Sequence, residues 1–296
     1  MDETEQLTEP AADIDDGDLE ERARPFRALY EHWERNQWSP LAIDYSRDAV
    51  SFAALDQEAR QGMIWIFAHR FHAESKVATV LAPFLMRATD YDLQVVLSTQ
   101  IADEFRHMTS VLRVYDEVFG ISDLESVQAI ADANMDPVAA KLYERFERRV
   151  HPLESSGDQD LFLQAVVSYH LIAEGVVART AQNLAAGQYA RYGSFPGLTE
   201  GQRLVARDEA RHIGIGVSYC RRRMAESRAH TMDVVTDVVE EFAELADSLL
   251  ETALTADIHA QVVAGYGVEP EEFYAEAMRL WQLRLSSIGF LDDSFR

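Results

Sequence analysis

The sequence predicts an all-α protein, a bundle of long helices in one large domain. Only 14 Gly and 8 Pro occur in 296 residues, and 47% of the residues are hydrophobic, which is enough for a substantial core. Apolar residues recur with the period of an α-helix through most of the chain, and no alternating strand pattern competes with it. A third observation is a repeated pentapeptide, Asp-Glu-x-Arg-His, which occupies 103–107 and again 208–212 inside two of these helical stretches.

Helical periodicity, with its start and stop signals, divides the chain into segments. In order they cover approximately 20–38, 55–88, 91–119, 126–150, 159–189, 199–228, 231–255 and 271–288. Residues 1–22 carry ten acidic side chains and one Arg with few large apolar groups, a composition typical of disorder. We therefore expect a disordered acidic leader over residues 1–18 and a single domain over residues 19–296.

Each pentapeptide places a Glu and a His on one face of its helix. Residues three apart lie about one turn apart at about 100° per residue. Glu104 with His107, and Glu209 with His212, can therefore aim a carboxylate and an imidazole at the same point. Two such helices, with one further Glu from each of two others, form the dinuclear site of ferritin-like bundles. The predicted fold is thus a ferritin-like helical bundle with additional helices and a dinuclear metal site in its core.

The two further carboxylates are expected in apolar helical stretches upstream of each motif. Glu74 precedes Glu104 by 30 residues and Glu174 precedes Glu209 by 35, which allows a helix, a turn and an antiparallel return. Four ionised glutamates in a core are costly unless cations neutralise them, and two divalent metals would do so. Oxygen and imidazole ligands without thiolate suit iron or manganese rather than structural zinc. For Glu74 or Glu174 alone, an ordinary acidic helix position is an equally good interpretation.

The charge balance argues against several classes of partner. With 51 acidic and 27 basic residues the net charge is −24, so the protein would repel nucleic acid and anionic membranes. We find no signal-peptide pattern and no run of about 18 apolar residues, and we expect a cytoplasmic protein without a membrane span. Cys220 is the single cysteine and cannot form an internal disulfide.

Upstream of the first predicted ligand the chain reads Trp38-Ser39-Pro40, then Ile43-Asp44 and Ser46-Arg47-Asp48. This segment, followed by the six predicted ligands in their order, resembles the ribonucleotide reductase small-subunit superfamily over most of the chain. Within it the sequence is most similar to the small-subunit-like ligand-binding oxidases. The resemblance implies one manganese and one iron ion per chain, with two iron ions as the alternative, and dioxygen as the oxidant. It also implies a bound long-chain fatty acid and a homodimer.

Three positions separate the oxidases from the reductase subunits within this resemblance. In radical-storing reductase subunits a Tyr lies four residues after the first motif His, and here that residue is Val111, so no tyrosyl radical can be stored there. In the oxidases the centre itself joins a Val and a Tyr by an ether bond, and the matching residues are Val77 and Tyr169. Val77 stands one turn beyond Glu74 on the same helical face. Taken alone, Val77 is an ordinary core valine and Tyr169 a buried, hydrogen-bonded tyrosine.

Metal-bound imidazoles normally donate their other N–H to an acceptor, and Asp103 and Asp208 are the natural acceptors. The resemblance implies a chain from His107 through Asp208 to Trp38 that could carry an electron, although a packing anchor at the start of the bundle is the stronger interpretation of Trp38. The walls of an acyl channel, or simply ordinary core, are expected around Phe71, Phe105, Val111 and Phe162.

The sequence thus predicts a dioxygen-activating oxidase that performs two-electron chemistry. The alternative is the small (beta) subunit of a manganese and iron ribonucleoside-diphosphate reductase that lacks the radical Tyr. Such subunits carry a C-terminal docking segment with a relay Tyr, whereas here the last Tyr is Tyr274 and helical pattern runs almost to residues 289–296. A metal-storage bundle is a third class, but storage requires a shell-forming assembly and a shorter four-helix chain.

Overall fold

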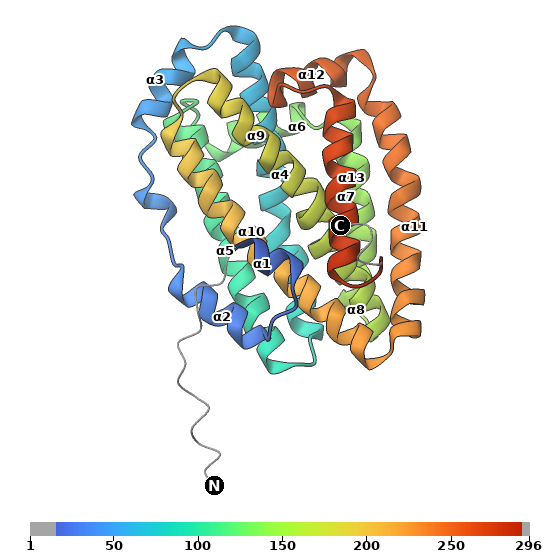
Figure 1. The fold of residues 1–296 in the computed structure, drawn as a ribbon. Coiled ribbons are helices and arrows are strands. Elements are labelled where there is room, and N and C mark those ends of the chain that lie inside the picture. Colours follow the sequence, from blue (N-terminus) through green and yellow to red (C-terminus); the bar gives the residue numbers. More distant parts are fainter. Residues whose placement is uncertain (1–15, 292–296) are drawn as a thin grey trace.

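Helices make up the fold of the described chain. The computed structural model describes residues 16–291, and no strand occurs within that range (Figure 1). The elements are α1 (Asp16–Glu21), α2 (Phe26–Arg35), η1 (Pro40–Ala42), α3 (Ser46–Ala54), α4 (Gln57–Arg87), α5 (Tyr91–Glu117), α6 (Leu124–Ala133), α7 (Pro137–Val150), η2 (His151–Glu154), α8 (Gln159–Val166), η3 (Val167–Ala178), α9 (Arg179–Tyr192), α10 (Pro196–Glu226), α11 (Arg228–Ala253), α12 (Ala256–Tyr266) and α13 (Pro270–Ser287). The predicted all-α class is confirmed.

Aspartate side chains define where several helices begin. A side-chain oxygen accepts a hydrogen bond from a backbone N–H in the first turn of α4, α5, α6, α7 and α8, and the residues are Asp56, Asp90, Asp123, Asp136 and Asp158. Such a bond satisfies one of the backbone donors that every helix start leaves free. Part of the acidic surplus therefore fixes helix boundaries.

A remote carboxylate fixes the start of α10, the helix that carries the second motif. Buried Asp48, on α3, accepts from the backbone N–H groups of Gly197 at 2.9 Å and Leu198 at 2.8 Å. A Cβ at Gly197 would lie 2.6 Å from the carbonyl oxygen of Asp44, so only glycine allows this approach. The segment after Trp38 thus sets the position of α10.

The predicted helix boundaries are wrong where proline interrupts the pattern. Segment 20–38 is divided into α1 and α2 at Pro25, and segment 126–150 into α6 and α7, where Asp136 caps the helix that Pro137 begins. Proline has no backbone N–H and is favoured in a first helical turn, so it starts a new helix in both places. The short helices α3 and α12, of 9 and 11 residues, were not expected because their apolar periods are too brief to stand out.

The predicted acidic leader is shortened at its C-terminal end. Residues 16–18 belong to α1, because Leu19 is fully buried and Glu20 forms ion pairs with Arg179 and Arg284. Residues 1–15 of that leader lie outside the described residues, as do residues 292–296 of the C-terminal segment. The disorder predicted for the leader and the short tail discussed above therefore stay predictions.

One long helix changes its winding beside the site. The stretch predicted as a single helix over 159–189 consists of α8, then the π-helix η3, then α9. In a π-helix the backbone bonds run from residue i to i+5, so residues five apart lie about one turn apart. Tyr169 and Glu174 are separated by that interval and therefore point in similar directions.

Four long helices form the centre of the bundle: α4, α5, the helix from α8 to α9, and α10 (Figure 1). Two large apolar clusters lie along it, one around Phe84, Phe162 and Ile213 and one around Phe71 and Leu198. On α4, α5 and α10 the predicted ligands come between residues of these two clusters. The polar layer is therefore enclosed by apolar core above and below.

Additional helices cover the central four. α11 contacts α7, α8, α10 and α13, α12 contacts α4 and α9, and α13 contacts η3 and α9, with α11 and α13 at one side of the bundle in Figure 1. α1 crosses α10 and reaches α13, while α2 lies against α5 and α10. These contacts make the predicted bundle with additional helices one continuous domain over the described residues.

One helix of the described chain, over 159–192, is long and apolar enough to cross a membrane. The sequence reading found no such run. However, 72% of the most apolar window of this helix is buried inside the protein, and its π-helical part carries Glu174. A buried apolar helix with a carboxylate facing the centre of a bundle has the composition of a core helix.

Candidate metal centre

Four helices bring the six predicted ligands together. The side chains come from α4, α5, η3 and α10 and are Glu74, Glu104, His107, Glu174, Glu209 and His212. Their ligand atoms form two groups within which all atoms lie no more than 4.8 Å apart, namely Glu74, Glu104, His107 and Glu209, and Glu104, Glu174 and His212. The fold therefore gathers, at the predicted position, two groups of side chains that could each hold a metal ion.

Two glutamates lie between the two histidines. Glu104 is 3.3 Å from Nδ1 of His107 and 3.4 Å from Nδ1 of His212. Glu209 is 3.7 Å from the first imidazole nitrogen and 3.6 Å from the second. Because each carboxylate presents one oxygen to each histidine, Glu104 and Glu209 are placed to bridge two ions.

The other two glutamates each approach one histidine. Glu74 Oε2 is 3.7 Å from His107 Nδ1, and Glu174 Oε1 is 3.9 Å from His212 Nδ1. Each therefore belongs to one half of the site, as a terminal ligand would. We call the half with Glu74 and His107 the first half-site, and the half with Glu174 and His212 the second.

The donor set fits metal ions. Each of the six side chains has a buried polar atom without a hydrogen-bond partner among the described residues: Glu74 Oε2, Glu104 Oε1, His107 Nδ1, Glu174 Oε2, Glu209 Oε2 and His212 Nδ1. Leaving that many polar atoms buried and unpaired is costly, whereas metal ions would use them as ligands. Carboxylate and imidazole donors without sulfur suit iron and manganese.

Charge in this layer is uncompensated without cations. Burial raises the pKa of Glu74 and of Glu174 well above the ordinary glutamate value. Burial by itself lowers the pKa of a histidine, yet the hydrogen bond with Asp103 and the nearby glutamates raise the pKa of His212 to about 10. His107, bonded to Asp208, has a pKa raised well above its ordinary value for the same reason. Without metals these side chains would be protonated, so metal binding must displace the protons.

The outer nitrogen of each motif histidine contacts the aspartate of the other motif. His107 Nε2, on α5, lies 3.3 Å from Asp208 on α10, and His212 Nε2, on α10, lies 3.2 Å from Asp103 on α5. Each Nδ1 is thereby turned towards the metal position. Trp38 Nε1 donates to Asp208 at 2.7 Å, so the predicted contacts from His107 through Asp208 to Trp38 are present.

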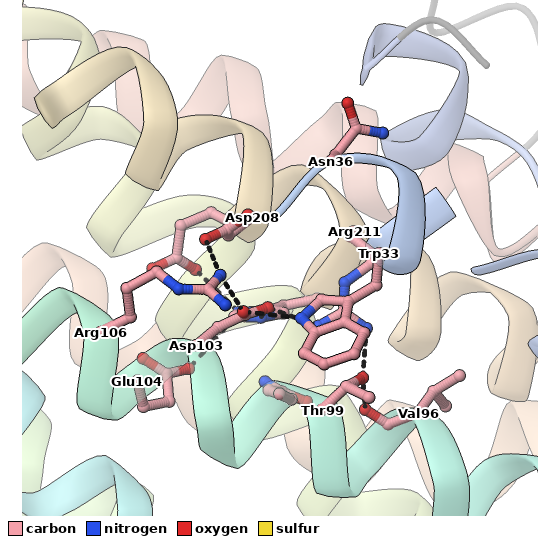
Figure 2. A network of polar contacts seen from close by, with 12 residues as sticks. Trp33, Asn36, Val96, Thr99, Asp103, Glu104, Arg106, Asp208 and Arg211 are labelled. Atoms are coloured by element: carbon pink, nitrogen blue, oxygen red, sulfur yellow. Dashed lines mark hydrogen bonds and ion pairs between the residues drawn. The ribbon is translucent and has the colours of Figure 1, made fainter. Parts of the chain in front are cut away.

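Asp103 lies at the centre of a dense polar network, which Figure 2 shows from close by. It accepts from Trp33 Nε1 at 2.8 Å and from the guanidinium groups of Arg106 and Arg211, each at 2.6 Å. Although burial opposes it, the hydrogen bond with His212 and the charge of Arg211 hold the pKa of Asp103 far below its usual range. Neither arginine occupies a ligand position, in keeping with a guanidinium group that donates hydrogen bonds and cannot ligate a metal.

Sequence reasoning missed Trp33. Its indole donates to Asp103 as that of Trp38 donates to Asp208, so the aspartate of each motif has its own tryptophan. The signal was available, because the two pentapeptides are identical in their Asp and two Trp residues lie five apart just upstream of the predicted ligands.

A second missed residue is Gln100, which is fully buried one turn before Glu104 on α5. Its amide Nε2 donates to Glu174 at 2.8 Å, and its Oε1 lies 3.1 Å from His170 Nε2. Burial lowers the pKa of His170 to about 3, so the ring is neutral and its Nε2–H donates to the glutamine. His170 thus acts on Glu174 through Gln100. No sequence pattern distinguishes this glutamine from one on the surface.

An apolar cavity of about 360 Å³ reaches the candidate centre. This volume lies in the range of small-molecule sites. Its wall contains all four predicted glutamate ligands together with Val77 and Tyr169, and otherwise consists mostly of apolar side chains such as Val80, Leu142, Phe146, Phe242, Leu245 and Trp281. The structure therefore places both residues of the predicted cross-link in the wall that the metals would share.

The residues first considered for an acyl channel do not line this cavity. Phe105 is 62% exposed on the outer face of α5. Phe71 and Phe162 belong to the two apolar clusters, and Val111 borders a separate space of about 20 Å³ on the other side of Glu74. Besides the ligand-bearing helices, α7, α11 and α13 line the observed cavity, and their distance from the motifs in sequence is why the pattern did not reveal them.

Comparison with known proteins agrees with this geometry. The model of the family "Ribonucleotide reductase, small chain" matches residues 22–266. This chain belongs to the ribonucleotide reductase small-chain family. Among solved structures it is similar to a valine-to-isoleucine variant of an R2-like ligand-binding oxidase with an anaerobically reconstituted Mn/Fe cofactor. That match has 20% identity over 90% of this chain and 94% of the other, at a TM-score of 0.77. A tyrosine-to-phenylalanine variant with an aerobically reconstituted Mn/Fe cofactor matches at 22% identity with the same coverages and TM-score.

Proposed function

We propose that the protein is a dioxygen-activating dinuclear oxidase that holds one manganese and one iron ion per chain. The observation that carries the proposal is the apolar cavity, whose wall joins the four glutamates to Val77 and Tyr169. The similar solved structures, R2-like ligand-binding oxidases with reconstituted Mn/Fe cofactors, support the choice of metals. Val111, where a radical-storing subunit would have Tyr, supports an oxidase over such a subunit.

The chain's own residues have distinct tasks in this proposal. Glu104 and Glu209 would each help to hold both ions, while Glu74 with His107 and Glu174 with His212 would each hold one. Asp103 and Asp208 hold the imidazoles in the orientation that points Nδ1 inward. The metals, when bound, supply dioxygen activation and accept electrons. The apolar clusters around the layer exclude water from it.

The first oxidation would join Val77 to Tyr169. The Cβ–H bond of the valine and the O–H bond of the tyrosine break, one C–O ether bond forms, and two protons and two electrons leave, with dioxygen as the oxidant. Burial raises the pKa of Tyr169 well above the ordinary value, so its phenol stays protonated until it reacts. The hydroxyl faces Glu174, and this contact opposes the rise in the pKa of that carboxyl. Glu174 is therefore the group placed to receive the phenolic proton.

The cavity supports an apolar ligand, and we assign a long-chain fatty acid to it. Its wall of aliphatic and aromatic side chains suits an acyl chain, and the metal ions held by the four glutamates would attract and pair a carboxylate end. We further propose that the protein works in the cytoplasm as a homodimer, in keeping with its family.

The decisive experiment is peptide mass spectrometry on protein loaded with manganese and iron, with and without oxygen. A linked pair of peptides containing Val77 and Tyr169, lighter than their sum by two hydrogens and present only after oxygen exposure, is expected. Protein without metals and a Tyr169→Phe variant are the controls, and both should remain unlinked. Unlinked peptides beside a fully loaded, oxygen-reactive site would favour the alternative, the small (beta) subunit of a manganese and iron ribonucleoside-diphosphate reductase.

A further inference from the structure

The two half-sites share one arrangement that the proposed function does not use. On the first side, His107 contacts Asp208, and Asp208 accepts from Trp38. On the second side, His212 contacts Asp103, and Asp103 accepts from Trp33 at 2.8 Å. Each half-site therefore has the same series of contacts, from a histidine to an aspartate and from that aspartate to a tryptophan.

The second series of contacts continues outward. The ring of Tyr30 stacks on that of Trp33, with 6.1 Å between centroids and 28° between planes. Tyr30 and Trp33 are both only partly buried, and the hydroxyl of Tyr30 bonds Glu34, which is exposed. Aromatic and hydrogen-bonded groups thus connect the solvent side of α2 to the imidazole of the second half-site without a break.

Satisfying a buried carboxylate does not require an indole. Asp103 already bonds the cations Arg106 and Arg211, and its four acceptor positions are shared among these two, His212 and Trp33. Of the other tryptophans, Trp65 keeps its Nε1–H without a partner among the described residues and lies in the wall of the cavity. An indole bonded to the aspartate of a ligand histidine is therefore a feature of the two motifs.

We propose that Trp33, Asp103 and His212 form an electron route to the second half-site, separate from that through Trp38. A soluble one-electron donor, such as a reduced flavin, gives one electron at the Tyr30 and Trp33 face, and the oxidised metal ion beside His212 gains it. No bond in the three residues breaks, and Trp33 returns to its starting state. Arg106 lies between the two routes, because it bonds Asp103 at 2.6 Å and Asp208 at 3.4 Å. This inference rests on the proposed redox centre.

The test compares reduction of the oxygen-treated centre in Trp33→Phe, Trp38→Phe and double variants with the unmodified protein. Absorbance of the centre is followed in a stopped-flow instrument after anaerobic mixing with a reduced flavin. Metal content and melting temperature are measured first, and both should match the unmodified protein. In the Trp38→Phe background, adding Trp33→Phe should slow reduction by about tenfold, the lower end of the losses in activity that follow when groups behind the metal ligands are changed.

Trp33→Tyr distinguishes an electron carrier from a packing residue, since tyrosine is also redox-active while phenylalanine is not. Recovery of most of the rate by Trp33→Tyr supports the route. A rate of reduction that Trp33→Phe leaves unchanged, both with Trp38 present and in the Trp38→Phe background, overturns the route. An equal loss of rate in Trp33→Phe and Trp33→Tyr overturns it as well. Unmodified protein that binds two metals but does not react with dioxygen would instead overturn the proposed function itself.

Discussion

The two half-sites carry the same motif but differ in the helix that supplies the terminal glutamate. Glu74 stands on the regular helix α4, its side chain is 13% exposed, and it borders a small space shared with Arg70 and Ser110. Glu174 stands on the π-helix η3, is 7% exposed, and is held by the amide of Gln100 at 2.8 Å. Equal ligands in unequal surroundings make two chemically different positions.

That difference matters for a centre with two different metals. Surroundings that fix a ligand carboxylate tune affinity and geometry as strongly as the ligands themselves. In the second half-site an amide holds the glutamate, whereas in the first Glu74 borders the small space and keeps its Oε2 without a hydrogen-bond partner among the described residues. The structure therefore contains a physical reason for the two positions to select different ions, even though the pentapeptides are the same.

The largest effect is expected from the shared carboxylates. Glu104→Ala or Glu209→Ala removes a ligand from both half-sites, so binding of both metals should be lost, whereas Glu74→Ala or Glu174→Ala should leave one metal bound. Metal per chain, measured by elemental analysis after gel filtration, distinguishes these results. Glu200→Ala, which changes an exposed glutamate paired with Arg203, should retain two metals. Full occupancy in either bridging variant would contradict the assignment.

Metal binding should also depend strongly on pH. The raised pKa values of Glu74, Glu174, His107 and His212 mean that these groups hold protons that metal ions must displace. Affinity should therefore fall as the pH is lowered, by about tenfold per pH unit for each proton released. Competition at His212 should end only as the pH rises through about 10. Calorimetry in two buffers of different ionisation enthalpy counts the protons, and equal heats in both would refute this expectation.

A smaller effect should separate the half-sites. Gln100→Leu removes the amide that holds Glu174 while keeping a similar volume, so affinity for the metal beside His212 should weaken by about 10–100-fold. Gln202→Leu is the matched control, because Gln202 is equally buried, borders the first half-site, and has no hydrogen-bond partner among the described residues. Competition with a chelator resolves the two affinities. A similar loss in both variants would show that the amide of Gln100 is not what distinguishes the halves.

The sequence predicted the ligands because helical geometry makes them a local pattern. A Glu and a His three apart, repeated at two places, determine one helical face without any knowledge of the neighbours. The pairing of Asp208 with Trp38 followed from resemblance, and the mirror pair of Asp103 with Trp33 could have followed from the repeat itself. The prediction of a helical bundle also depended on local sequence, since it needed only the helical period.

What could not be predicted depends on packing between distant segments. The winding around Glu174 is π-helical where η3 packs against α10 and α13, and no sequence pattern in that stretch predicts it. Much of the cavity wall comes from α7, α11 and α13, whose apolar faces are indistinguishable from ordinary core in the sequence. Gln100 is recognised only once Glu174 and His170 are seen on its two sides.

The smallest effects on the protein should come from alanine substitutions at two glycines, one in a close helix contact and one in open space. Gly216, on α10, lies so close to η3 that a Cβ would approach Cβ of His170 to 2.5 Å, whereas a Cβ at Gly187, on α9, meets nothing within 4 Å. Gly216→Ala should therefore destabilise the protein by about 1–3 kcal/mol through overpacking. Gly187→Ala should stabilise it by about 0.4–1 kcal/mol, because alanine has fewer unfolded conformations to lose.

Denaturant unfolding of the metal-free variants measures both changes. Gly216→Ala should in addition weaken binding of the metal beside His212 more than binding of the metal beside His107. The reason is that the displaced His170 bonds Gln100, and Gln100 in turn bonds Glu174. Equal weakening of both metals would mean that the strain spreads through α10 as a whole. The close approach of α10 to η3 would then serve stability alone, and the asymmetry between the half-sites would depend on Gln100 without support from the glycine.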